Sequence, residues 1–168
     1  MSKILNLRED FCDIDEGTFL LLVEPHNIPH LVFLQDGRYY SLTYKGVELG
    51  FSFPPYLEKL VRLQKKIIFL EVDRSKESPF QVFSDYVAAG EDDQTCFFPI
   101  KQLLKPESEA QLIFELIPEL YADGIIKDAM HFGLNELLDE EGNFELSEYT
   151  KSDVLAYIAN LKEKYAEG

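Results

Sequence analysis

Two apolar runs that are separated by only two residues constrain this fold more than any other feature of the sequence. Residues 30–35 (HLVFLQ) and 38–44 (RYYSLTY) are rich in branched and aromatic side chains, and only Asp36-Gly37 lies between them. Asp-Gly suits the centre of a type I′ turn, where both residues need a positive φ. The pattern therefore predicts a tight antiparallel hairpin.

The neighbouring segments extend this hairpin into a meander. Residues 18–24 (TFLLLVE) form a short apolar run before it, and such a run is typical of a buried strand. Lys45-Gly46 makes a second tight turn that leads into residues 47–53. We therefore expect the first part of the chain to be an antiparallel β-meander.

The next segment mixes helices with a further strand. Pro54-Pro55 suits the first turn of a helix, because proline there loses no helical hydrogen bond. Residues 66–73 (KIIFLEVD) predict a strand, and residues 97–104 predict a short helix. Residues 80–89 fit a helix face, but their aromatic and branched side chains also suit a strand. That alternative stays open.

Helical signals dominate after Pro106. Ser108 with Gln111 three residues later resembles a capping box and predicts a helix from there to about residue 116. Residues 125–138 have mixed helical spacing, and Thr150 is placed to cap a last helix. This segment is expected to be helical and to pack on the sheet.

Together these patterns predict an α+β fold in one domain that spans residues 1–168. The sheet-rich part covers about residues 1–105, and the acidic helical part covers about residues 106–168. We expect one domain because the helices need an apolar surface to cover.

The charge of the chain is strongly negative and unevenly distributed. The net charge is −15. Residues 1–105 hold 12 basic and 16 acidic residues, whereas residues 106–168 hold 4 and 15. Nonspecific nucleic-acid binding needs a Lys/Arg surface, so it is not expected. The excess is either a solvated surface that promotes solubility or a docking face for a basic protein.

The binding interpretation leads to a specific hypothesis about function. No catalytic motif is recognisable, and an aromatic-rich sheet lies beside the acidic part, so we expect a small protein that binds another protein. An inhibitor or immunity-type protein that masks a basic toxin or enzyme is a concrete form of this hypothesis. Tyr and Phe side chains would anchor the partner, and six carboxylates would steer it: Glu136, Asp139, Glu140, Glu141, Glu145 and Glu148.

The expected cellular compartment is inferred from two signals that the sequence lacks, one for secretion and one for membrane insertion. No apolar segment follows the first charged residues, and the longest apolar run, residues 19–23, is too short to span a membrane. We therefore expect a cytoplasmic protein with no membrane contact, in which Cys12 and Cys96 are free thiols.

A cysteine-dependent hydrolase or transferase is the alternative function. Cys96 precedes the short helix at 97–104, and a helix N-terminus can lower the pKa of a thiol. His30 or His26 would then act as the base that a thiol nucleophile needs. The order of a histidine opening a strand hairpin and a later cysteine at a helix start is similar to circularly permuted papain-like hydrolases. Only residues 30–37 carry this similarity.

That resemblance implies a second polar site residue about a dozen positions after the histidine. Only Ser41 or Thr43 could take the place of that residue here. The acidic residues 91–93 before Cys96 would disfavour a thiolate.

Metal and cofactor sites are not expected. His26 and His30 are four residues apart, but Pro29 prevents a helix from placing them on one face, and further ligands would have to come from elsewhere in the fold. Residues 139–148 (DEEGNFELSE) resemble a calcium loop whose first ligand position is Leu137, which cannot bind the ion.

Overall fold

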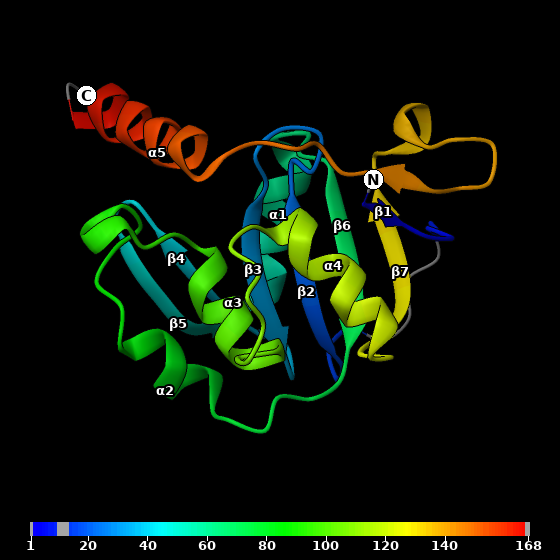
Figure 1. The fold of residues 1–168 in the computed structure, drawn as a ribbon, viewed down its shortest axis with the longest axis horizontal. Helices are drawn as coiled ribbons and strands as arrows, with labels where there is room; N and C mark the ends of the chain where they lie inside the picture. The colour runs from blue at the N-terminus through cyan, green and yellow to red at the C-terminus, as the bar shows by residue number, and fades with distance from the viewer. Residues whose placement is uncertain (1, 10–13, 167–168) are drawn as a thin grey trace.

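The protein has an α+β fold built on a six-stranded antiparallel sheet (Figure 1). The structure is a computed structural model that describes residues 2–9 and 14–166. The order of strands in the sheet is β5-β4-β3-β2-β6-β7. These strands are β2 (Thr18–Val23), β3 (His30–Gln35), β4 (Arg38–Thr43), β5 (Gly46–Ser52), β6 (Ile67–Val72) and β7 (Ile126–Phe132).

In the part of the chain that the structure describes, the remaining elements are a two-stranded ribbon, five helices and two 3₁₀ turns. The ribbon pairs β1 (Lys3–Ile4) with β8 (Phe144–Glu145). The helices are α1 (Phe53–Arg62), α2 (Pro79–Ser84), α3 (Phe97–Leu104), α4 (Ile113–Ala122) and α5 (Lys151–Ala166). The turns are η1 (Glu91–Asp93) and η2 (Asn135–Leu137).

The hairpin and the meander predicted from the sequence are confirmed. Asp36 and Gly37 have φ values of 54° and 75°, as a type I′ turn requires. Strands β2 to β5 are neighbours in chain order, and β6 pairs with the free edge of β2. The meander therefore forms the main part of the sheet.

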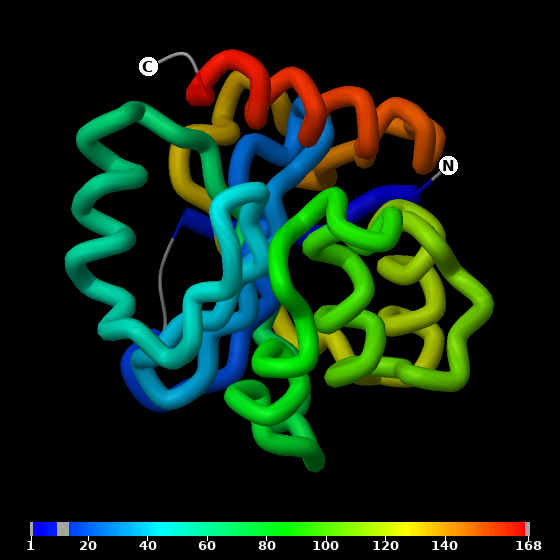
Figure 2. The backbone as a smooth tube through the Cα atoms, turned by 90° about the vertical axis from the view of Figure 1, so that its left-hand side faces the viewer, coloured from blue at the N-terminus to red at the C-terminus, as the bar shows by residue number. Residues whose placement is uncertain are grey.

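Helices cover both faces of this sheet, as Figure 2 shows. Because side chains alternate between the faces of a strand, Leu21 and Val32 pack with Phe53 of α1, whereas Leu20 and Phe33 pack with α2, α3 and α4. Helix α5 crosses one end of the sheet (Figure 1). The core thus draws on helices from both the sheet-rich and the acidic part of the chain.

Two elements in the second half differ from the sequence prediction. Residues 126–132 form strand β7 and not a helix, because the free edge of β6 supplies hydrogen bonds along its whole length. Helix α4 begins at Ile113 and not near Ser108. The carboxylate of Glu115 accepts the N–H groups of Gln111 and Leu112, both at 3.1 Å, and this fixes the later start.

Two other predictions are confirmed, the helix at 97–104 and the cap at Thr150, and the open alternative at 80–89 is decided. Residues 97–104 form helix α3, and the open segment 80–89 begins within helix α2 and then becomes a loop. At the start of α5, the Thr150 N–H donates to Asp153 Oδ2 at 2.8 Å, and the Asp153 N–H donates to Thr150 Oγ1 at 3.1 Å. This reciprocal cap explains where α5 begins.

Candidate functional site

The turn between β2 and β3 forms one end of the sheet and carries two of the candidate residues. Glu24 has a φ of 58°, and its N–H donates to the Lys66 carbonyl at 2.8 Å. His26 Nε2 lies 3.0 Å from Glu24 Oε2. Pro25 and Pro29 limit the backbone on either side, so the turn is held rigidly. His26 is thereby bound to the turn itself.

His30, at the start of β3, leads into a chain of hydrogen bonds. Its Nε2 lies 3.0 Å from Ser41 Oγ, and Ser41 Oγ donates to Glu48 Oε1 at 3.1 Å. Tyr39 donates to the other oxygen of Glu48 at 2.9 Å. Since the Ser41 proton is directed to Glu48, the serine oxygen accepts from His30, and this places the imidazole proton on Nε2.

Sheet geometry explains why these side chains meet. Ser41 faces Glu48 across the β4–β5 pair, and Tyr39 lies two residues before Ser41 on the same face of β4. Ser41 is fully buried. Burial lowers the pKa of His30 to about 4, although the nearby Glu48 charge opposes the shift. The imidazole is therefore neutral at pH 7.

Cys96 lies at the N-cap of α3, as the sequence predicted, but its surroundings do not favour a thiolate. The residue is half-buried and packs against the core on the α3 side of the sheet. Burial raises the pKa of its thiol to about 11, and a contact with the Leu31 backbone offsets only part of that shift. The Nε2 atom of His30, the candidate base, is bonded to Ser41.

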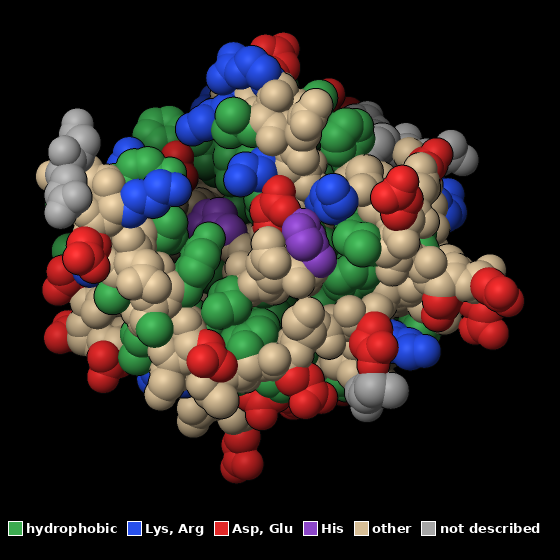
Figure 3. All heavy atoms as spheres, turned by 90° about the horizontal axis from the view of Figure 1, so that it is seen from above, with side chains coloured by type: hydrophobic (Ala, Val, Ile, Leu, Met, Phe, Trp, Pro, Cys, Tyr) green, Lys and Arg blue, Asp and Glu red, His purple; other side chains and the backbone are tan. Residues whose placement is uncertain are grey.

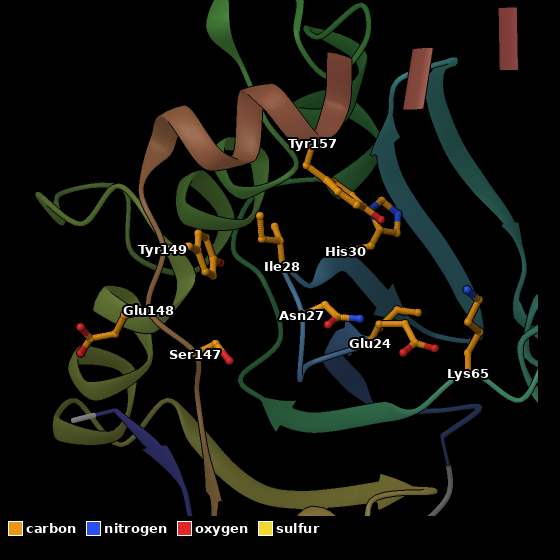
Figure 4. A pocket seen from close by; sticks show the side chains of 10 residues that line it. Glu24, Asn27, Ile28, His30, Lys65, Ser147, Glu148, Tyr149 and Tyr157 are labelled. Carbon is orange, nitrogen blue, oxygen red and sulfur yellow. The ribbon is translucent and has the colours of Figure 1, made fainter. Parts of the chain in front are cut away.

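Two adjoining cavities lie between the β2–β3 turn and α5, and we call them together the cleft. The larger has a volume of about 760 Å³, and the smaller, apolar one has a volume of about 220 Å³. Ile28, His30 and Tyr157 line both. In Figure 4, Tyr157 extends from α5 toward His30.

Cys96 lines the apolar cavity, so the cleft brings Cys96 and His30 to one place. His26 lines neither cavity. Figure 3 views this end of the molecule, where histidine side chains reach the surface among both acidic and basic groups.

The six predicted partner-binding carboxylates lie on residues 136–148, which we call the acidic segment. It runs through η2 and β8 beyond the β7 edge of the main sheet, and its last residues pass over the end of the sheet toward α5 (Figure 1). Glu148 there lines the cleft. All six residues are exposed: Glu136, Asp139, Glu140, Glu141, Glu145 and Glu148.

Asp139 has a structural role within the acidic segment. Its Oδ1 accepts the N–H groups of Asn143 and Glu141, both at 2.9 Å. The bond from Asn143 is the largest cause of its lowered pKa. Among the described residues, Lys3 is the only cation within ion-pairing distance of the six carboxylates, at 3.9 Å from Asp139.

The remaining expectations concern metals, membranes and thiols. In residues 2–9 and 14–166, no three His, Cys, Asp or Glu side chains are grouped closely enough to hold a metal ion. No helix in the same ranges has the length and apolar character needed to cross a membrane. Cys96 is a free thiol, whereas Cys12 lies outside the described residues.

Comparison of the chain with protein-family models, with curated proteins and with solved structures finds no match. The cleft and the acidic segment are therefore the features of the molecule that bear on its function.

Sequence reasoning missed the two hydrogen bonds that connect His30 to Ser41 and Ser41 to Glu48. A signal was present, because Ser41 and Glu48 are polar residues on either side of the Lys45-Gly46 turn, in strands that are otherwise largely apolar. Polar residues at facing positions of a hairpin are candidates for one hydrogen-bonded pair.

Proposed function

We propose that this protein acts by binding a basic protein partner through the acidic segment. An inhibitor or immunity-type protein that masks a basic toxin or enzyme is the concrete form of the proposal. The observation that supports it is the exposure of all six carboxylates within 13 residues of chain, with Lys3 as the only cation within ion-pairing distance of any of them among the described residues. Such a cluster creates a strong local negative potential.

Electrostatics would act mainly on the rate of encounter. A cluster of like charges attracts an oppositely charged partner over about 8–10 Å at physiological salt, and it accelerates association more than it strengthens the final complex. The acidic segment protrudes from the main sheet (Figure 1), so a partner can approach it without first displacing a helix.

Apolar contacts would then hold the complex together. Phe132 at the end of β7 and Leu137 in η2 are 37% and 41% exposed, and they lie on either side of Glu136 in the chain. Stable interfaces commonly have an apolar centre within a charged rim. Phe132 and Leu137 are therefore our candidates for the anchoring side chains.

The thiol-based alternative lacks comparable support. Cys96 and His30 both line the apolar cavity, but burial raises the thiol pKa and lowers the imidazole pKa. Both groups are consequently neutral at pH 7, whereas a cysteine nucleophile is most reactive as a thiolate. This electrostatic arrangement favours the binding function.

The test is a pull-down from a lysate of the source organism with the full chain as bait. We expect one basic protein to be retained at low salt and released at high salt. A variant with Glu140→Gln, Glu141→Gln and Glu145→Gln should retain much less of it, and its association rate with the purified partner should fall about tenfold at low salt.

The matched control neutralises three exposed carboxylates elsewhere, with Glu58→Gln, Glu107→Gln and Glu109→Gln. It changes the net charge equally, so a general charge effect would slow both variants alike. Equal association rates for the wild type and the acidic-segment variant would refute the proposal.

A further inference from the structure

The cleft beneath α5 has the shape of a site for a molecule with two chemically different ends. The smaller cavity is lined almost entirely by apolar side chains, including Leu42, Ile158 and Leu161. The larger cavity carries polar groups, among them Glu24 and Glu148. Because the two share Ile28, His30 and Tyr157, one ligand can occupy both.

The charges on the cleft favour a positively charged ligand. Glu24 and Glu148 line the larger cavity, and Lys65 is the only Lys or Arg that does so among the described residues. Figure 4 places Lys65 beside Glu24 and far from Glu148. A third carboxylate, Glu48, does not line the cavity but accepts a hydrogen bond from Ser41 at 3.1 Å. Ser41 is in turn bonded to His30, which does line the cavity. The net charge around the cavity is therefore negative.

The uncharged groups of the wall favour the same kind of ligand. His30 donates its Nε2 proton to Ser41, so Nδ1 remains a hydrogen-bond acceptor. Tyr149 and Tyr157 stand on the α5 side of the cavity (Figure 4), and aromatic rings attract cations through their faces. An acceptor nitrogen and two tyrosine rings suit an N–H donor better than a carboxylate.

We propose that the cleft binds a small organic cation, in which an ammonium or guanidinium head occupies the larger cavity and an apolar stem occupies the smaller one. This site shares Glu148 with the acidic segment, but its ligand is a small molecule and not the proposed basic protein. It needs no partner protein, so the two proposals can fail independently.

Calorimetric titration of the full chain with a matched set of small molecules tests the site. We expect hexylammonium to bind at least tenfold more tightly than hexanoate or hexanol, which have the same stem. Affinity should rise about threefold to fourfold for each methylene between propylammonium and hexylammonium, as burial of a CH₂ group predicts. No binding of hexylammonium, or tighter binding of hexanoate, would overturn the proposal.

Two substitutions assign the binding to the cleft. Glu24→Gln keeps an acceptor oxygen for the Lys66 N–H but removes the charge, so hexylammonium affinity should fall about tenfold. Glu145→Gln removes an exposed charge that lines neither cavity, and it should change the affinity less than twofold. Equal affinities for the two variants would place the cation elsewhere and refute the assignment.

Discussion

At the scale of single residues, the chemistry of Cys96 separates the two functional interpretations. Its thiol has a pKa of about 11, so about one thiol in ten thousand is ionised at pH 7. In a Cys12→Ser background, where Cys96 is the only thiol, we expect alkylation about a hundredfold slower than that of free cysteine. The rate should rise about tenfold per pH unit up to about pH 10, because the thiolate fraction does.

The role of His30 is tested in the same assay. His30 Nε2 is bonded to Ser41, and its lowered pKa leaves no imidazolium to stabilise a thiolate. His30→Gln should therefore leave the alkylation rate of Cys96 unchanged within about twofold, as should the control His26→Gln. A rate that exceeds that of free cysteine near pH 7, and that falls when His30 is replaced, would revive the catalytic alternative.

At the scale of elements, α5 is the helix with the least support from the core. Only Val154 and Ile158 of its 16 residues are buried, and the apolar cavity lies beneath it. Tyr165 near its end stacks on Tyr44 with ring centroids 5.9 Å apart. We expect the amides of α5 to exchange hydrogen at least a hundredfold faster than those of β2, because segments with few buried contacts open locally.

A pair of substitutions ties this exchange to packing. Ile158→Ala removes one of the two buried side chains and should speed exchange in α5 without changing it in β2. The exposed Glu163→Ala is the control and should change neither. If the amides of α5 and β2 exchange at the same rate, then α5 opens only when the whole protein unfolds. The helix that covers the cleft would then be fixed in place.

The same scale shows which elements the sequence could predict. The Asp36-Gly37 hairpin and the Thr150 cap depend on residues next to one another in the chain, and both are confirmed. The strand at 126–132 depends on the free edge of β6, which lies more than 50 residues away. Local spacing carries no information about such an edge, and tertiary pairing overrode the helical pattern there.

The candidate site, like the fold, has one part that the sequence could predict and another that it could not. Exposure of the acidic segment was predictable, because long runs of carboxylates remain in water. The shared cleft was not predictable, since His30, Cys96 and Tyr157 come from three elements that meet only in the folded chain. The sequence identified His30 and Cys96 as candidates, but it could not indicate that burial would make both neutral.

At the scale of the whole molecule, the net charge of −15 connects the proposed function to stability. The acidic segment concentrates like charges, and Lys3 is the only cation within ion-pairing distance of them among the described residues, so we expect mutual repulsion to destabilise the folded state. The Glu140→Gln, Glu141→Gln and Glu145→Gln variant should therefore gain about 0.5–1 kcal/mol in the free energy of unfolding at low salt. Asp139 is kept, because its bonds to Glu141 and Asn143 hold the turn.

Urea unfolding at two salt concentrations measures this gain. The control with Glu58→Gln, Glu107→Gln and Glu109→Gln makes the same change in net charge at scattered positions, so it should gain less. The difference between the two variants should largely disappear at about 0.5 M salt, where screening acts within a few ångströms. A loss of stability in the acidic-segment variant would mean that its carboxylates support the fold. A gain in stability would mean that these carboxylates destabilise the fold, which is expected of charges whose role is to bind a partner.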